Sequence, residues 1–305
     1  MMKRLKKIVL NIDFELVSTK YSIFIKFLVA WYMFDILICS LNYSYFWGEK
    51  SIYLGSQSFG LSSSNYFMKI INLLNIDPIS NFAFLFIIAQ LISGFLILFN
   101  ISTNKFTYVL FYLLSSNLQV PIAYGLDGGN NLANILFLYL LIFDWSDLKC
   151  LDIKTREYTT FIAFSLTVIQ VCLVYLVAGF SKVEGDLWQN GTALYYIMQI
   201  PQYYTPYLSD LALQSDIILV LGNYATIIFQ LYFPIIFFKP VKRIWISIGI
   251  LLHISISLVL GLLQFGALMS IVYILFFDQK WIDFLIRISK SNEKIKRLFK
   301  RKVFK

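Results

Sequence analysis

Lys182 lies where a long apolar run ends, in the stretch AGFSKVEGDLWQNG at residues 178–191. A lysine that is partly removed from water loses its proton more easily and can act as a general base. The neighbouring acids Glu184 and Asp186 oppose that change if they lie close, and their spacing does not decide which effect prevails. The alternative is a membrane helix that simply ends here, with Lys182 reaching the headgroups and Trp188 anchoring the interface. The residues alone leave both roles open.

Two other ionisable residues fall inside apolar runs, Asp35 and the chain's single histidine, His253. A charge within a membrane span is costly and indicates a functional site by default. Each residue lies roughly 12 Å below the outer end of its predicted span at 1.5 Å per residue, so the two share a similar depth. We treat both as candidate supporting groups for a catalytic Lys182, while packing between helices is the alternative for His253. One histidine and no cysteine cluster predict no metal site.

The segment GLDGGNN at residues 125–131 forms a turn between two apolar runs. Its glycines permit positive φ, and successive backbone N–H groups in such a turn can bind an anion. The alternative is a tight hairpin that needs glycine for its shape alone. The candidate pocket residues from this turn are Asp127, Gly128, Gly129, Asn130 and Asn131.

The elements that position these residues are predicted to be membrane helices. The chain has 305 residues, of which 59% are hydrophobic and only 14% are charged, with a mean hydropathy of +0.71. Apolar runs of about 20 residues, the length needed to cross a bilayer, recur along it. We therefore expect an all-α, polytopic membrane helical bundle with about eight transmembrane helices, the last two separated by a break around LGLLQFG at 260–266. The predicted spans are 21–43, 81–100, 106–125, 131–146, 159–181, 216–238, 244–261 and 264–279.

Basic residues set the predicted orientation in the cell membrane. With both termini in the cytoplasm, every Lys and Arg except Lys26, Lys50, Lys69 and Lys182 falls in an inside segment, as the positive-inside rule requires. The loops 44–80 and 183–215 then lie outside. This distribution explains the net charge of +9 without nucleic acid. The expected organisation is a cytoplasmic basic N-terminus (1–20), one transmembrane domain (21–279) and a cytoplasmic basic amphipathic tail (280–305) on the inner leaflet.

Three segments resemble the vitamin-K-dependent γ-carboxylase superfamily. The stretch YLVAGFSKVEGDLWQNGTALYYI at 175–197 is similar to its central motif, an aromatic residue, A-G-x-x-K, a short acidic stretch, Trp, Gly and an aromatic-containing helix. The similarity also covers 128–141 and 251–277. The superfamily includes bacterial horizontally transferred transmembrane (HTTM) domain proteins. Within these, short chains without a soluble extension resemble the sporulation-delaying protein B-like group, which is associated with producing secreted antimicrobial peptide toxins alongside a precursor and a partner protein.

The resemblance implies roles for particular residues. Lys182 matches the motif lysine, the base that deprotonates reduced vitamin K in the carboxylase, and a quinone is the cofactor that this implies. Where the carboxylase motif has a histidine after paired asparagines, this chain has Leu132, and the large luminal domain is missing. Carboxylation of glutamate is therefore not expected. The residues that the motif adds to the candidate pocket are Glu184, Trp188, Gly191 and Tyr195.

Three functions are open at this point. The first is a membrane factor that acts at the outer face in the maturation of an exported antimicrobial peptide, with a peptide precursor, a small partner protein and lipid as partners. The second is a quinone-dependent oxidoreductase or carboxylase-like enzyme that uses Lys182 as its base. The third is a non-enzymatic immunity, binding or transport component in which the polar residues only shape a cavity.

Overall fold

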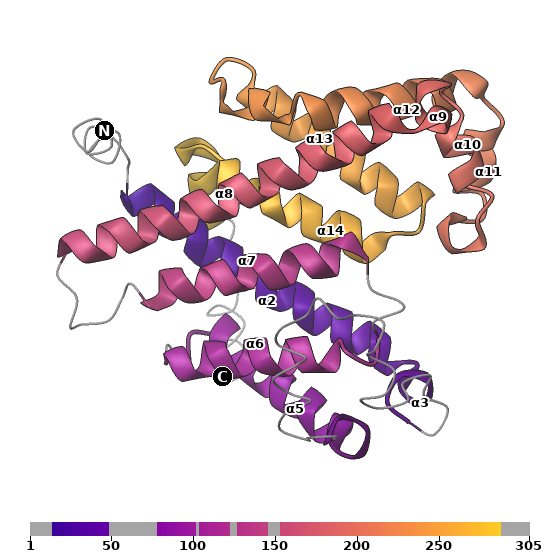
Figure 1. The fold of residues 1–305 in the computed structure, drawn as a ribbon. Coiled ribbons are helices and arrows are strands. Elements are labelled where there is room, and N and C mark those ends of the chain that lie inside the picture. The colour runs from indigo at the N-terminus through magenta and orange to yellow at the C-terminus, as the bar shows by residue number, and fades with distance from the viewer. Residues whose placement is uncertain (1–13, 49–77, 102–103, 123–126, 146–152, 288–305) are drawn as a thin grey trace, which may run out of the picture.

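The computed structural model describes residues 14–48, 78–101, 104–122, 127–145 and 153–287 (Figure 1). Across these residues the chain is helical and contains no strand, as the sequence predicts. Eight helices of ten or more residues lie in the described part and overlap the eight predicted spans one by one. They are α2 (Phe14–Ser40), α5 (Pro78–Leu98), α6 (Lys105–Leu118), α7 (Gly128–Trp145), α8 (Ile153–Glu184), α12 (Asp216–Leu231), α13 (Lys242–Val259) and α14 (Leu263–Val272).

Three of the described helices are long and apolar enough to cross a membrane: Leu16–Ser40, Tyr158–Glu184 and Lys242–Val259. A fourth span results if Leu263–Phe276 and Gln279–Arg287, which meet at a bend of 117°, form one broken crossing. By length and composition these helices fit a membrane protein. The eight crossings and the cytoplasmic position of both termini stay predictions, and residues 1–13 and 288–305 of the predicted cytoplasmic segments lie outside the described residues.

Short helices follow several of the long ones. After α2 comes α3 (Tyr43–Phe46), and after α8 come α9 (Asp186–Gln189), α10 (Ala193–Ile197), η3 (Pro201–Tyr203) and α11 (Leu208–Leu213). The turn η4 (Phe233–Phe237) links α12 to α13, and η5 (Tyr273–Phe276) extends α14. In Figure 1, α9, α10 and α11 gather at the end of the bundle where α8 finishes. Most of the predicted outer segment 183–215 is therefore folded onto the helix ends.

The break between the last two predicted spans is confirmed. Helix α13 ends at Val259 and α14 begins at Leu263, and between them Gly261 has φ +68°, a left-handed conformation that favours glycine. The chain reverses there, and α14 packs back against α13. Gly266 permits the close approach, because a Cβ at this position would overlap the Ser257 side chain and the His253 carbonyl.

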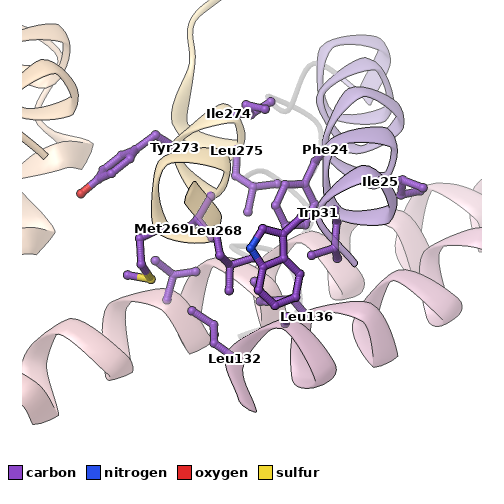
Figure 2. Close-up of a cluster of buried hydrophobic side chains, with 14 of the residues drawn as sticks. Phe24, Ile25, Trp31, Leu132, Leu136, Leu268, Met269, Tyr273, Ile274 and Leu275 are labelled. Carbon is purple, nitrogen blue, oxygen red and sulfur yellow. The ribbon is translucent and has the colours of Figure 1, made fainter. Parts of the chain in front are cut away.

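Helix α14 lies in the centre of the main hydrophobic core, where it packs on α2, α7 and α13. Figure 2 shows Trp31 of α2 facing Leu136 of α7 and Leu268 of α14. The Trp31 indole donates its N–H to the carbonyl of Gln264 at 2.9 Å, so the buried ring is also satisfied as a hydrogen-bond donor. This core lies between two groups of polar residues, one around Asp35 and one around His253, which the sequence predicts at similar depth in the membrane.

Candidate functional site

Lys182 lies in the last turn of α8, and its ammonium lies against Trp188 of α9. Its Nζ is 4.9 Å from the centre of the Trp188 ring, a cation–π distance, and it donates a long hydrogen bond of 3.5 Å to the carbonyl of Ala178. No acid forms an ion pair with Lys182 among the described residues. The two motif residues that the sequence singled out as anchor and base are thus direct neighbours.

A hollow of about 450 Å³ opens beside Trp188, between α9 and α10. That volume is in the range of small-ligand pockets, roughly 300–1,000 Å³. Its lining is mainly apolar and aromatic, with Asp186 as the acidic member. The lining residues are Gly185, Asp186, Leu187, Trp188, Ala193, Tyr196, Ile197 and Ile200.

Two residues of α12 hold helix α9 in place, and the sequence analysis identified neither. The Asn223 amide donates to the Trp188 carbonyl at 2.7 Å, and the Tyr224 hydroxyl donates to the Gln189 carbonyl at 2.7 Å. Asn223 is completely buried. An amide inside the apolar run 216–238 was the available signal, because a buried polar group needs a partner.

None of the remaining motif residues lines the hollow: Gly191 is buried, whereas Glu184 and Tyr195 are exposed. Gly191 is buried with φ +75°, and a Cβ added there would lie 3.4 Å from the Tyr224 ring, so glycine suits the turn that brings α9 next to α12. Glu184 is exposed and does not line the hollow. Tyr195 is 44% exposed and packs edge-on against Tyr196, which does line it.

His253 belongs to a different, fully buried group of residues. Its Nε2 is 2.7 Å from the hydroxyl of Tyr175 on α8, which is in turn 2.8 Å from the hydroxyl of Tyr273 on η5. Figure 2 shows the Tyr273 hydroxyl directed away from the surrounding hydrophobic cluster. The Tyr175 ring also stacks on Phe233 at 3.9 Å. This arrangement ties α8, α13 and η5 together.

Asp35 lies in a second buried polar group, between α2, α6 and α7. The Asn130 amide donates to the Asp35 carboxylate at 3.3 Å. Next to it, the Tyr32 hydroxyl donates to Asn134, whose amide donates to the Gln119 side chain, each at 2.8 Å. All these residues except the half-buried Asn134 are buried. These hydrogen bonds link polar side chains of α2 and α7 with Gln119 at the end of α6, while the buried Nε2 of Gln119 has no hydrogen-bond partner among the described residues.

Of the predicted anion-binding turn, the structure describes residues 127–131, and their backbone N–H groups are partly occupied by the chain itself. Gly128 and Gly129 open helix α7 and do not have positive φ. The Asp127 carboxylate accepts from the backbone N–H groups of Gly129 and Asn130, at 2.7 and 3.1 Å, and the Asn130 side chain accepts from the Asp127 N–H at 3.2 Å. This reciprocal pattern is a capping box. The chain's own carboxylate occupies the N–H groups that an anion would need, and Asn131 is exposed.

Asp35 and His253 do not share one site. Helix α14 packs on both α2 and α13 and lies between the two polar groups. The Phe265 ring of α14 is edge-on to the His253 ring, with 5.8 Å between the ring centres, and a Cβ added at Gly129 would lie 3.3 Å from the Phe265 ring. The structure brings Lys182 and Trp188 together, but not Lys182 with Asp35 or His253. Among the described residues, no group of His, Cys, Asp and Glu side chains could hold a metal ion.

Comparison with known proteins identifies two relatives from Bacillus subtilis (strain 168). The chain is 28% identical to sporulation-delaying protein SdpB over 188 residues, which are 56% of this chain and 57% of that protein. It is 25% identical to the uncharacterized protein YitO over 186 residues, 56% of this chain and 60% of that protein. The match therefore spans less than two thirds of each relative. No protein-family model and no solved structure matches the chain. A relationship to SdpB is supported, whereas membership of the wider HTTM and carboxylase superfamily stays a prediction.

Proposed function

We propose that this chain is an integral membrane component of a system that produces an exported peptide toxin, and that it acts at the outer face of the membrane. The observation that carries the proposal is the similarity to sporulation-delaying protein SdpB. The apolar helices support a place in the membrane. The charge distribution supports the outer face, since no basic residue lies between Lys182 and Lys239.

The hollow beside Trp188 is the proposed contact site for the peptide. Its lining of Leu, Ile, Trp and Tyr side chains suits an apolar peptide segment, which would gain about 25 cal/mol for each Å² removed from water. Lys182 lies next to this lining, where its Nζ is over the Trp188 ring and its charge orients that side chain. Asn223 and Tyr224 keep this wall in position by holding the α9 loop.

A quinone step is not part of the proposal. Lys182 is not among the residues that line the hollow, and its Nζ lies over the Trp188 ring. A base must be within hydrogen-bond reach of the proton that it removes. Since Lys182 does not line the hollow, a molecule bound there would not lie within hydrogen-bond reach of its Nζ. The geometry therefore does not support Lys182 as the base of a deprotonation step.

The function is tested by mass spectrometry of peptides secreted from native cells with and without the gene. Loss of a mature peptide in the deletion strain, and its return on expression of the full chain, is the expected result. An identical set of secreted peptides in both strains would overturn the proposed function.

The site is tested with variants in the same assay. Trp188→Ala and Tyr196→Ala should lower the amount of mature peptide at least tenfold at equal protein level. Tyr195→Ala is the matched control, because it removes the neighbouring tyrosine that does not line the hollow. Lys182→Met keeps the length of the side chain without its charge, and Lys182→Arg keeps the charge. Reduced peptide in the first and normal peptide in the second are expected, and normal peptide in all of these variants would contradict the site.

A further inference from the structure

A second hollow lies at the other end of the bundle, where α13 begins. It has a volume of about 280 Å³ and is lined by Arg243, Lys280, Trp281 and Phe284. Arg243 belongs to the first turn of α13, and the other three belong to the helix Gln279–Arg287. In Figure 1, α12 and α13 run between this end and the end that carries α9, α10 and α11. The two hollows are thus separated by the length of the bundle.

An ion pair fixes one wall of this hollow. The Arg243 guanidinium binds the Asp278 carboxylate through Nε at 2.7 Å and through a second nitrogen at 2.5 Å. Asp278 also accepts from the backbone N–H of Trp281 at 3.2 Å, so it caps the helix that follows the 117° bend. Asp278 therefore holds Arg243 and the Gln279–Arg287 helix side by side.

The second cation of the hollow keeps its charge available. The nearest acid along its own helix, Asp283, accepts a hydrogen bond from Gln279 at 2.9 Å. Among the described residues, no acid forms an ion pair with Lys280. Lys280 is exposed, and Phe284, one turn further along, is 59% exposed. A cation and two aromatic side chains thus face the same space.

We propose that this hollow binds the headgroup of an anionic phospholipid. The phosphate would lie between Lys280 and Arg243, whose guanidinium has donors beyond the two that Asp278 accepts. Trp281 and Phe284 would lie against the glycerol and upper acyl region, where aromatic side chains concentrate at membrane interfaces. Basic pockets on the cytoplasmic side of membrane helices bind such headgroups. The predicted orientation places this end of α13 inside, and a free phosphate would leave both aromatic walls without a partner.

The proposal is independent of the toxin-production function and is tested on the purified full-length protein. Native mass spectrometry in a zwitterionic detergent measures binding of dioleoyl-phosphatidylglycerol and, separately, of dioleoyl-phosphatidylcholine. We expect selective retention of the anionic lipid. Lys280→Gln should weaken phosphatidylglycerol binding about fivefold, the effect of one basic residue near a membrane surface. Arg287→Gln is the matched control, since it removes a charge from the same helix outside the hollow and should change the affinity less than twofold.

Competition with inorganic phosphate distinguishes a site for a lipid headgroup from a site for free phosphate. Phosphate should not displace phosphatidylglycerol at equal concentration, and Phe284→Ala should weaken lipid binding several-fold. Equal binding of the two lipids, equal affinity of wild type and Lys280→Gln, or full displacement by inorganic phosphate would each overturn the proposal. Lys280 and Phe284 are exposed, so neither substitution disturbs the core, and a thermal unfolding scan verifies that each variant is folded.

Discussion

Replacing Gly249 with alanine should destabilise the junction of α8, α13 and η5 by about 3 kcal/mol. Gly249 is buried on α13, and an added Cβ would overlap the hydroxyl and the adjacent ring carbon of Tyr273. The Phe229 ring lies 2.8 Å from the same point, so Tyr273 has to move to make room. Movement of Tyr273 breaks its 2.8 Å hydrogen bond with Tyr175.

The magnitude combines three effects. Forcing an extra methyl group into a packed core costs about 1–3 kcal/mol. A buried hydroxyl that loses its partner costs about 1–3 kcal/mol more. Against these, alanine is favoured over glycine inside a helix by about 1 kcal/mol. The penalties prevail, because the space next to Gly249 is filled on two sides by aromatic rings.

The assay is an unfolding titration of the purified protein in mixed detergent micelles, followed by tryptophan fluorescence. Gly128→Ala is the matched control, since Gly128 is exposed at the start of α7 and a Cβ there meets no atom within 4 Å. This control should be neutral or stabilising by up to about 1 kcal/mol. The reasoning is refuted if Gly249→Ala is as stable as Gly128→Ala, because Tyr273 would then be free to yield at no cost.

Three further predictions concern the loops and caps. Burial raises the pKa of Asp127 above its usual 3.8, so the free energy of unfolding should fall as pH rises above that value. Asp127→Asn keeps the cap and should reduce this slope in unfolding titrations at several pH values. Gly261→Ala should cost about 1–2 kcal/mol in the same titration, because its φ of +68° strains any residue with a Cβ. Tyr224→Phe removes the 2.7 Å bond to the Gln189 carbonyl and, at about 1 kcal/mol, should speed hydrogen exchange of residues 186–191 about fivefold; unchanged exchange would contradict it.

The apolar runs, and the segments that interrupt them, predicted the helices of this fold. The break expected around LGLLQFG is found at residues 260–262. The contact of Lys182 with Trp188 could also be predicted from the sequence. The two residues lie on either side of the end of one helix, and only a short segment separates them. Local signals of this kind depend on few residues and are little changed by the rest of the molecule.

Contacts between distant segments could not be predicted in the same way. Depth along a span places Asp35 and His253 at one level, but it does not fix which helices are neighbours, and α14 lies between them. The glycines at 128 and 129 have the composition of an anion-binding turn, yet Asp127 caps the helix that they open. Composition permits both outcomes, and the hydrogen-bond partners decide.

Burial and hydrogen bonding together indicate where the chemistry of this chain belongs. Asp35 and His253 each have hydrogen-bond partners from other helices and are 5% and 2% exposed, which is how polar residues hold membrane helices in register. A molecule from outside cannot reach such groups without opening the core. Lys182 differs, since it is half-buried, carries no ion pair in the described part of the chain, and lies beside a hollow open to a ligand. A change at Asp35 or His253 should therefore lower the amount of folded protein, whereas a change at Lys182 or Trp188 should lower peptide production with the protein level unchanged.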